Sequence, residues 1–439
     1  MRAGWALLRR RDFGLLWAGG LISETGDWFL LVGLPVWVFK LTGSSLVTAT
    51  VFLVGLLPSL VVGPLAGVLA DRWDRRRTLV AVSLAEAVFL LPLLAVDGPD
   101  RLWIVYLVMA VEASLGQLND PVRNALVPSL VPRDDLVAAN ALIGLNSNLA
   151  RLVGSPLGGV LVELAGLPGL VIGDAISFLL GAALLALVRP RASTPSPFEG
   201  PRRGSLPGEA DERGELSTAP GGFVREWVDG LRVTLGDHGL RWGLVVNGMA
   251  AVAQGVFTVL FVVFVTRELG GDGAQVGLLR GVQAIGGLLG GVAVVGLARR
   301  LEPGRLLGLC LVVFAVVDLA IWNGPLVTTA GWLYLGLFVA AGIPGIGVMT
   351  GLTALVQERT GRAFLGRVFA TYYGSFNGLM ALGMLAAGLL GDAVGVVTVL
   401  NGQAALYLLA GMVALATLGR RAQTDSYPRA SKRVRIPLA

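Results

Sequence analysis

The sequence predicts an all-α polytopic membrane protein with twelve transmembrane helices in two pseudo-symmetric six-helix bundles. The first observation is composition: 54% of the 439 residues are hydrophobic and only 15% are charged, whereas soluble domains carry about 25% charged residues. The second is that the apolar residues fall into windows long enough to span a bilayer, which takes about 20 residues. The third is an internal repeat, because "NALVPSLVPRDDL" (124–136) can be laid on "TALVQERTGRAFL" (353–365).

Hydropathy places the spans one after another with short loops between them, and an even number puts both chain ends on one side. The predicted spans are 13–39, 45–70, 78–97, 102–120, 136–161, 167–188, 241–266, 274–298, 305–322, 328–350, 364–390 and 394–418.

Between the sixth and seventh predicted spans lies a Pro-, Gly-, Ser- and charge-rich stretch that cannot bury enough apolar area to fold. After it, apolar and charged residues segregate to two faces of a helix, which predicts a helix on the inner membrane surface; a cytoplasmic extension of the seventh span is the alternative. The predicted organisation is an N-terminal bundle (1–188), a disordered cytoplasmic linker (189–222), an amphipathic surface helix (223–238), a C-terminal bundle (239–419) and a basic cytoplasmic tail (420–439).

Most of the 35 Lys and Arg residues fall in alternate loops, so the net charge of +6 records orientation and not nucleic-acid binding. We therefore expect a multi-pass protein of the cell membrane (inner or plasma) with both termini in the cytoplasm. The N-terminus has no cleavage-site pattern, and we expect no removed signal peptide. With one cysteine (Cys310) and one histidine (His238), we also expect no disulfide, no multi-ligand metal site and no cofactor.

The apolar run before the third predicted span ends abruptly in "GVLADRWDRRRTL" (67–79). This G-x-L-A-D-R-x-x-R-R pattern resembles the loop signature of the major facilitator superfamily, with Asp74 where the family usually has glycine. The resemblance implies a cytoplasmic gate that latches the two bundles in the outward-facing state; the second half, at "GGVAVVGLARRLEPGRLL" (290–307), lacks the aspartate. The predicted gate residues are Gly67, Asp71, Arg72, Arg75 and Arg76.

In the fifth predicted span, "GLNSNLARLVGSPLGG" (144–159) is similar to the Gly/Pro-rich segment of drug/proton antiporters in this superfamily, except that Ser155 stands where glycine is expected. Glycines permit close helix packing, and a proline bends a helix. The resemblance therefore implies a hinge at Gly154, Pro156, Gly158 and Gly159, with a plain packing seam as the alternative.

Four further stretches resemble the macrolide-efflux and siderophore-export branch of the superfamily: "FGLLWAGGLISETGDW", "ALVPSLVPRDDLVAANAL", "GDAISFLLGAALLA" and "LGRVFATYYG". The resemblance covers nearly the whole chain outside the linker and the tail. It implies the fold strongly and the substrate only weakly.

Ionisable residues inside spans are expensive in lipid, at roughly 2.5–3.5 kcal/mol each, and are functional candidates by default. Glu24 and Asp27 share one face of the first span, and Arg151 lies in the middle of the fifth. A pair between Arg151 and Asp27 or Glu24 would couple transport to protons; a permanent structural salt bridge is the alternative. Further acids and one base also lie in or near spans and have packing or interfacial alternatives: Glu86, Glu112, Glu163, Asp174, Asp318 and Arg280.

Uncharged hydrogen-bonding and aromatic residues in the spans would suit an amphipathic ligand, although each can also be explained as a contact between helices. The predicted substrate-cavity residues are Asn146, Asn247, Gln254, Phe257, Phe261, Gln283, Tyr372, Tyr373, Phe376 and Asn377.

The sequence thus predicts a monomeric secondary active exporter that moves a small amphipathic organic compound, such as a drug, macrolide or siderophore, by alternating access and proton antiport. It contains no G-x-x-x-x-G-K-[ST] motif for ATP. Membrane lipids and protons are the other expected partners. The alternatives are a lipid flippase or an importer of the same fold, a lipid-modifying membrane enzyme with His238 beside Asp237, or a receptor without turnover.

Overall fold

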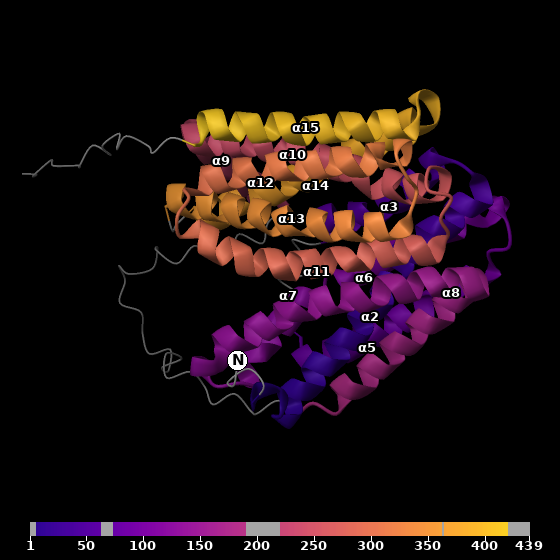
Figure 1. Cartoon of the computed structure of the whole chain (residues 1–439). Coiled ribbons are helices and arrows are strands. Elements are labelled where there is room, and N and C mark those ends of the chain that lie inside the picture. The colour runs from indigo at the N-terminus through magenta and orange to yellow at the C-terminus, as the bar shows by residue number, and fades with distance from the viewer. Residues whose placement is uncertain (1–5, 63–72, 190–219, 362–363, 420–439) are drawn as a thin grey trace, which may run out of the picture.

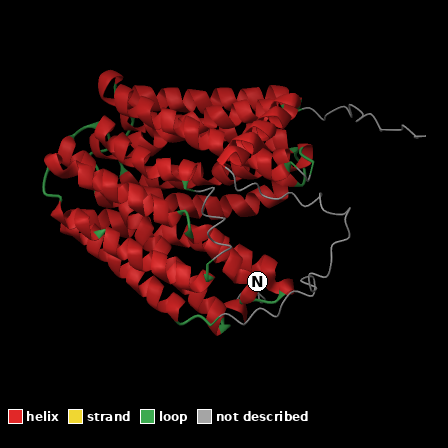
Figure 2. Ribbon diagram, turned by 180° about the vertical axis from the view of Figure 1, so that it is seen from behind, coloured by secondary structure: helices red, strands yellow, loops and turns green. Residues whose placement is uncertain are grey.

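The computed structural model of the chain describes residues 6–62, 73–189, 220–361 and 364–419. Helices make up nearly all of this backbone, and the described ranges contain no strand (Figure 2). A helix satisfies its own backbone hydrogen bonds, which is why long apolar helices can cross lipid. The chain is an all-α polytopic membrane protein, as predicted.

The first bundle is formed by the helices that precede the predicted linker, with short 3₁₀ turns between some of them. Its helices are α2 (Arg11–Thr42), α3 (Ser45–Val61), α5 (Arg75–Phe89), α6 (Leu102–Gly116), α7 (Asn119–Leu126) and α8 (Leu136–Ala186). The 3₁₀ turns are Leu91–Ala95, Pro99–Arg101, Val127–Ser129 and Arg133–Asp135.

The second bundle follows, introduced by a shorter helix, α9. Its helices are α9 (Pro220–Gly236), α10 (His238–Arg267), α11 (Gly273–Ala298), α12 (Pro303–Asn323), α13 (Gly331–Arg359), α14 (Leu365–Val394) and α15 (Val396–Thr417), with a 3₁₀ turn at Gly324–Leu326.

Every predicted span has a helical counterpart. Within the described residues, ten helical stretches are long and apolar enough to cross a membrane, and Ser45–Ser59 forms a shorter apolar helix; the remainder of the second predicted span, 63–70, lies outside the described residues. One of the ten, Arg133–Ala186, contains two predicted spans, so the helices account for all twelve. The fourth predicted span is longer than expected, because helix resumes at α7 after a break at Gln117.

Helix α8 is a hairpin and not one continuous rod. Gly166, followed by Pro168, has φ 60° and ψ −154°, a backbone conformation that only glycine adopts readily. Both ends of α8 meet the start of α2, since Asp135 pairs with Arg10 at 3.2 Å and the Arg189 backbone N–H donates to Asp12 at 3.0 Å. The fifth and sixth spans therefore run in opposite directions beside α2.

The two bundles meet at one end and diverge toward the other (Figure 1). We call the end where α2 begins and where α9 lies the basic end, because Arg10, Arg75, Arg133 and Arg189 stand there. The opposite end holds the turn between α2 and α3. Between the bundles, α8 packs against α11 and α3 packs against α14.

Glycines set the distance between the bundles along the α8–α11 seam. A Cβ at Gly277 would overlap the carbonyl oxygen of Ser155, and one at Gly159 would overlap the carbonyl oxygen of Gly273. The predicted hinge residues lie here: Gly159 and Pro156 face α11, whereas Gly154 and Gly158 face the backbone of α2. The segment thus packs against a helix on each side, and its action as a hinge stays a prediction.

Helix α9 is separate from the seventh span. The chain leaves the helical conformation at Asp237, with φ −98° and ψ 130°, and the Asp237 side chain accepts a hydrogen bond from the Leu240 N–H at 2.8 Å. The alternative of a continuous extension is therefore not observed. Gly230 of α9 packs against the backbone of Arg367 on α14; contact with a membrane surface stays a prediction.

Replacing Gly277 by alanine should destabilise the protein. The new methyl group meets backbone that cannot move alone, and overpacking of this kind costs about 1–3 kcal/mol. The measurement is the thermal unfolding temperature of the purified protein, followed by tryptophan fluorescence in detergent. Gly291→Ala is the matched control, since nothing lies within 4 Å of its Cβ position on the same helix. Equal melting temperatures for the two variants would contradict the close packing of α8 against α11 at Gly277.

Candidate substrate cavity and its gates

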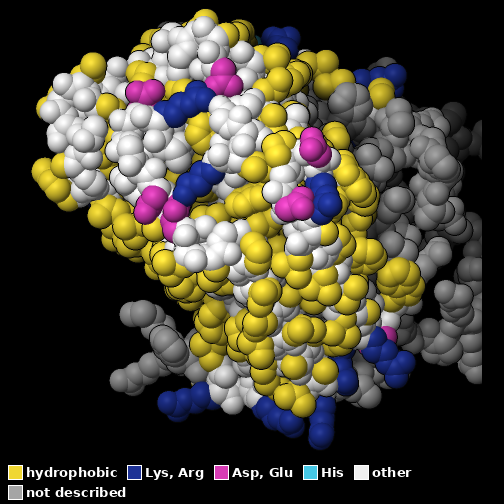
Figure 3. Space-filling model, turned by 90° about the vertical axis from the view of Figure 1, so that its right-hand side faces the viewer, with side chains coloured by type: hydrophobic (Ala, Val, Ile, Leu, Met, Phe, Trp, Pro, Cys, Tyr) yellow, Lys and Arg dark blue, Asp and Glu magenta, His cyan; other side chains and the backbone are white. Residues whose placement is uncertain are grey.

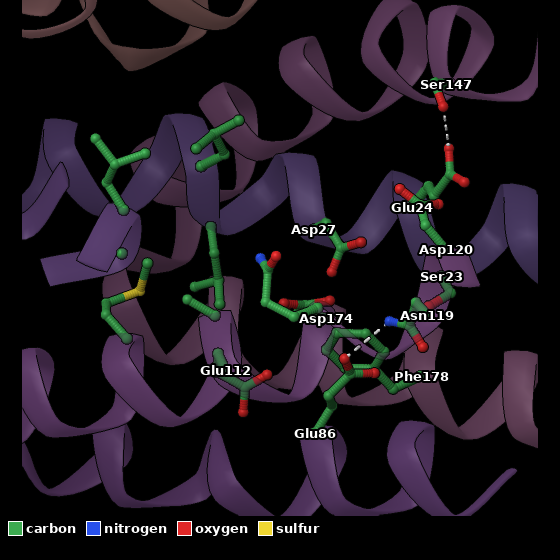
Figure 4. A pocket seen from close by; sticks show the side chains of 18 of the residues that line it. Ser23, Glu24, Asp27, Glu86, Glu112, Asn119, Asp120, Ser147, Asp174 and Phe178 are labelled. Carbon is green, nitrogen blue, oxygen red and sulfur yellow. Dashed lines mark hydrogen bonds between the residues drawn. The ribbon is translucent and has the colours of Figure 1, made fainter. Parts of the chain in front are cut away.

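A cavity of about 580 Å³ lies inside the first bundle and reaches the second (Figure 4). We call it the acidic cavity, because six acids and two arginines line it. Most of its wall comes from α2, α3, α5, α6 and α8. The second bundle contributes Gln254, Thr258, Arg280, Met380 and Met384.

Four of its acids come from four different helices: Asp27 from α2, Glu86 from α5, Glu112 from α6 and Asp174 from α8. Figure 4 shows them grouped around the cavity, with the carboxylates of Asp27 and Asp174 beside each other. Glu86 is only 2% exposed and Asp174 is fully buried. The sequence marked the last three as intramembrane acids but did not assign them to one site.

These acids keep free acceptor oxygens. Asn119 donates to Glu86 Oε1 at 3.1 Å and the Ser177 hydroxyl donates to Asp174 Oδ1 at 3.1 Å. Glu86 Oε2, Glu112 Oε1 and Asp174 Oδ2 are buried and have no hydrogen-bond partner within the described part of the chain. Unpartnered buried oxygens are costly, so each needs an explanation.

Glu24 pairs with Arg123 and not with Arg151, so the predicted pair between Arg151 and Glu24 or Asp27 is not formed in this structure. Arg123 Nη1 donates to Glu24 Oε1, its Nη2 donates to Asp120 at 2.6 Å, and the Ser147 hydroxyl donates to Glu24 Oε2 at 2.9 Å. Arg151 does not line the cavity; it lies 6.0 Å from the ring centre of Trp28.

The sequence missed Arg123 because the predicted fourth span stopped at residue 120 and left it among the orienting loop arginines. The helix in fact resumes at Asn119 and carries Arg123 back toward α2. The detectable signal was Asp120, three residues earlier, which forms an i,i+3 pair with it.

A second cavity, of about 560 Å³, lies in the second bundle. We call it the aromatic cavity, because no charged residue lines it and Phe314, Phe369, Tyr372, Tyr373, Phe376 and Tyr407 do. Two hydrogen bonds to backbone carbonyls fix its wall: Asn247 donates to Tyr372 O at 3.1 Å, and the Tyr372 hydroxyl donates to Leu240 O at 2.6 Å.

Six of the ten predicted substrate-cavity residues line the aromatic cavity, and one of them, Gln254, also lines the acidic cavity. The six are Asn247, Gln254, Tyr372, Tyr373, Phe376 and Asn377.

The other four predicted cavity residues line neither cavity and serve packing. Asn146 is buried and donates to Trp17 O at 3.1 Å, and Gln283 accepts from Arg280 at 3.0 Å. The rings of Phe257 and Phe261 contact each other in a tilted arrangement, with their centres 5.5 Å apart, within the buried core. Their helix, α10, is apolar on nearly all sides, so hydropathy did not indicate which face meets the cavity.

At the opposite end, two clusters join the bundles. In the first, Arg267 pairs with Asp392 at 2.7 Å within the second bundle. Ser45, at the start of α3, donates its backbone N–H and its hydroxyl to Asp392, both at 2.9 Å, and Arg267 donates to the Gly43 carbonyl at 2.6 Å. The hydrogen bonds between the bundles here all involve backbone or hydroxyl groups on the first bundle, and the Arg267 guanidinium also lies 5.0 Å from the ring centre of Phe39.

The second cluster has the same design with the bundles exchanged. Lys40 pairs with Glu163 at 2.5 Å within the first bundle, and Glu163 accepts the backbone N–H of Gly273 at the start of α11. A helix N-terminus attracts a carboxylate. In Figure 3, which faces this end, acidic and basic side chains lie beside each other in the upper part of the view.

The predicted cytoplasmic gate is only partly described. Gly67, Asp71 and Arg72 lie outside the described residues, and Arg75 and Arg76 form the first turn of α5. Asp74, which replaces the glycine usual in the family, has its own use: its side chain accepts the Arg77 N–H at 2.8 Å and caps the helix.

The Asp237–His238 pair, the basis of the membrane-enzyme alternative, is explained by local structure. Asp237 caps α10 and lies 3.6 Å from Arg359, and the His238 ring lies 6.4 Å from that of Trp242. Neither residue lines the acidic or the aromatic cavity.

Comparison with known proteins decides the family. The model of the family described as "transmembrane secretion effector" matches residues 2–203 and 211–437. The chain belongs to this family of the major facilitator superfamily. It is therefore a multi-pass membrane transporter with a small-molecule substrate, and not an enzyme.

Individual relatives agree with this family. The transporter is 25% identical over 389 residues to "Macrolide efflux protein A" of Streptococcus pyogenes, which covers 88% of this chain and 90% of that protein. It shares its fold with a bacterial homologue of the iron transporter ferroportin in an inward-facing state, with a TM-score of 0.70 at 17% identity over 93% of this chain and 99% of that one. The outward-facing ferroportin homologue gives a TM-score of 0.55 at 19% identity over 93% and 100%.

Breaking the Glu24–Arg123 pair from one side should be costly. The two side chains are only 19% and 14% exposed, and removing one partner of a buried pair costs about 3–5 kcal/mol. We expect Glu24→Gln and Arg123→Gln each to lower the melting temperature strongly, and the double variant to lose much less than the sum.

Asp120→Asn is the matched control, because Asp120 contacts the same arginine but is 76% exposed, and pairs at that exposure contribute about 1 kcal/mol or less. A double-mutant cycle with no coupling energy between Glu24 and Arg123 would show that the pair does not form.

Proposed function

We propose that this transporter is a secondary active exporter of a small amphipathic organic compound, driven by proton antiport and working by alternating access. The observation that carries the proposal is a buried, acid-lined cavity facing both bundles, which are closed against each other at the opposite end. The relatives named for macrolide efflux support the direction of transport.

The basic end is proposed to be cytoplasmic. Arginines are concentrated there, and segments rich in Lys and Arg stay on the cytoplasmic side of the membrane. Both termini would then be cytoplasmic, in the cell (inner or plasma) membrane, and the protein works as a monomer. With the opposite end closed, the described conformation faces inward and would accept a substrate from the cytoplasm or the inner leaflet.

For proton coupling, Glu24 and Asp27 are the proposed carriers. Both line the acidic cavity, and Glu24 forms an ion pair with Arg123. Protonation of Glu24 would remove the negative charge that holds Arg123 and so release the arginine. Arg151 is retained here as a proposed proton-coupling residue. In this conformation it lies beside Trp28 and not beside either acid.

Alternating access is proposed to occur by rocking of the bundles 1–188 and 239–419 about the α8–α11 and α3–α14 seams, with the linker 189–222 as a tether. At the opposite end the bundles are joined by a few hydrogen bonds to Asp392, Glu163 and the Gly43 carbonyl. Loss of these bonds would open the cavity outward.

Substrate binding should release protons from the purified protein. In lightly buffered detergent, addition of macrolides, dyes or siderophores to the wild type should acidify the medium, and Asp27→Asn or Glu24→Gln should abolish the signal. Asp318→Asn is the matched control, because Asp318 is a buried acid that lines neither cavity and is held by Gln403 at 2.8 Å. Substrate binding without proton release in any variant would refute antiport.

Disrupting the Arg267–Asp392 cluster should shift the conformational equilibrium outward. Asp392→Ala removes the acceptor for both Ser45 bonds, so the separation of the bundles at the opposite end should grow. The measurement is the distance between two spin labels, obtained by double electron–electron resonance. The labels are attached to cysteines introduced at the exposed positions Asp100 and Val327, in a Cys310→Ser background.

The control for this shift is Asp97→Ala. Asp97 is an exposed acid in the loop that also carries the Asp100 label, but its ion pair, with Arg101, stays within one bundle. Identical distance distributions for Asp392→Ala and wild type would show that the cluster does not hold the bundles closed.

A further inference from the structure

The acidic cavity and the aromatic cavity are adjacent and not independent. Gln254 and Met380 line both of them, so the two cavities share part of their wall. Each has a volume of more than 500 Å³, within the range of about 300–1,000 Å³ that holds a small organic ligand. A ligand that reaches past these two shared side chains would extend from one cavity into the other.

The charge of the two cavities is strongly unequal. Arg123 is already engaged by Glu24 and Asp120, which leaves Asp27, Glu86, Glu112 and Asp174 without an ion pair among the described residues. Against these four acids stands Arg280, which donates to Gln283 and lies 5.1 Å from the ring centre of Phe257. The aromatic cavity has no charged residue.

Individual atoms indicate that the acids have unused capacity to bind a ligand. Glu86 and Asp174 are at least nine-tenths buried, line the cavity, and each holds one buried oxygen without a partner in the described chain. Figure 4 shows their carboxylates among those grouped around the cavity. A ligand with a positive centre would satisfy these oxygens, whereas an anion would have to approach four acids.

We propose that the two cavities form one site for an amphipathic organic cation, with its positive centre among Asp27, Glu86, Glu112 and Asp174 and its apolar body against the aromatic cavity. This rests on the proposed function and narrows its substrate class. Glu86, Glu112 and Asp174 then determine charge selectivity, and anionic compounds such as deprotonated siderophores are excluded as substrates.

Two probes of matched shape and opposite charge test the proposal. Tetraphenylphosphonium and tetraphenylborate have the same four phenyl rings, and neither titrates. Binding of each to the purified full chain at pH 7 would be measured by equilibrium dialysis. We expect the cation to bind at least tenfold more tightly than the anion; equal binding, or preference for the anion, overturns the proposal.

Variants then place the positive centre. Glu112→Gln and Asp174→Asn, singly and together with Glu86→Gln, should weaken tetraphenylphosphonium binding by tenfold or more and leave tetraphenylborate binding unchanged or stronger. Asp318→Asn, a buried acid outside both cavities, should bind like the wild type. Wild-type affinity for the cation in the triple variant overturns the proposal. If the triple variant does not fold, the single variants and the wild-type probe comparison still decide.

Transport is measured separately, by efflux of ethidium from cells that express the chain and by the proton-release assay. Selective cation binding without export or proton release would refute the proposed function and leave the site in place. Export together with preference for tetraphenylborate would refute the site and leave export in place.

Discussion

The cost of placing a charge in lipid governs this structure. Each ionisable group in a span has to be paired, hydrogen-bonded or turned toward a polar cavity, because the bilayer core offers no solvent to it. The protein meets this requirement differently in its two halves. The first bundle gathers its acids around one cavity, whereas the second satisfies its buried Asp318 with the Gln403 amide.

This division explains why the bundles are related in fold and differ in chemistry. The seams between them are built alike, from small residues that bring backbones together: Gly277 meets Ser155 in one, and Gly388 meets Leu46 in the other. Because backbones touch along the seams, polar side chains are placed in the cavity and at the two ends of the molecule instead. The first bundle therefore supplies the acids of the proposed site, and the second supplies its aromatic surface and Arg280.

Much of the fold could be predicted from sequence, because length and hydropathy define a spanning helix directly. The rotation of each helix about its own axis, which decides which side chains line a cavity, was harder to predict. Phe257 and Phe261 were expected in the cavity, but an apolar helix buried on nearly all sides gives no signal for the face that lines it. Arg123 was missed for another reason: an arginine near a span end has the same appearance whether it orients the protein or reaches back to Glu24.

The clusters at the opposite end have a consequence for the energy of opening. In both, the ion pair lies within one bundle, Arg267 with Asp392 in the second and Lys40 with Glu163 in the first. The contacts that these clusters make between the bundles are hydrogen bonds to backbone or hydroxyl groups, together with the Arg267 guanidinium 5.0 Å from the ring centre of Phe39. Separation of the bundles therefore creates no isolated charge, since every carboxylate keeps its own cation. The barrier to opening should consequently depend little on ionic strength.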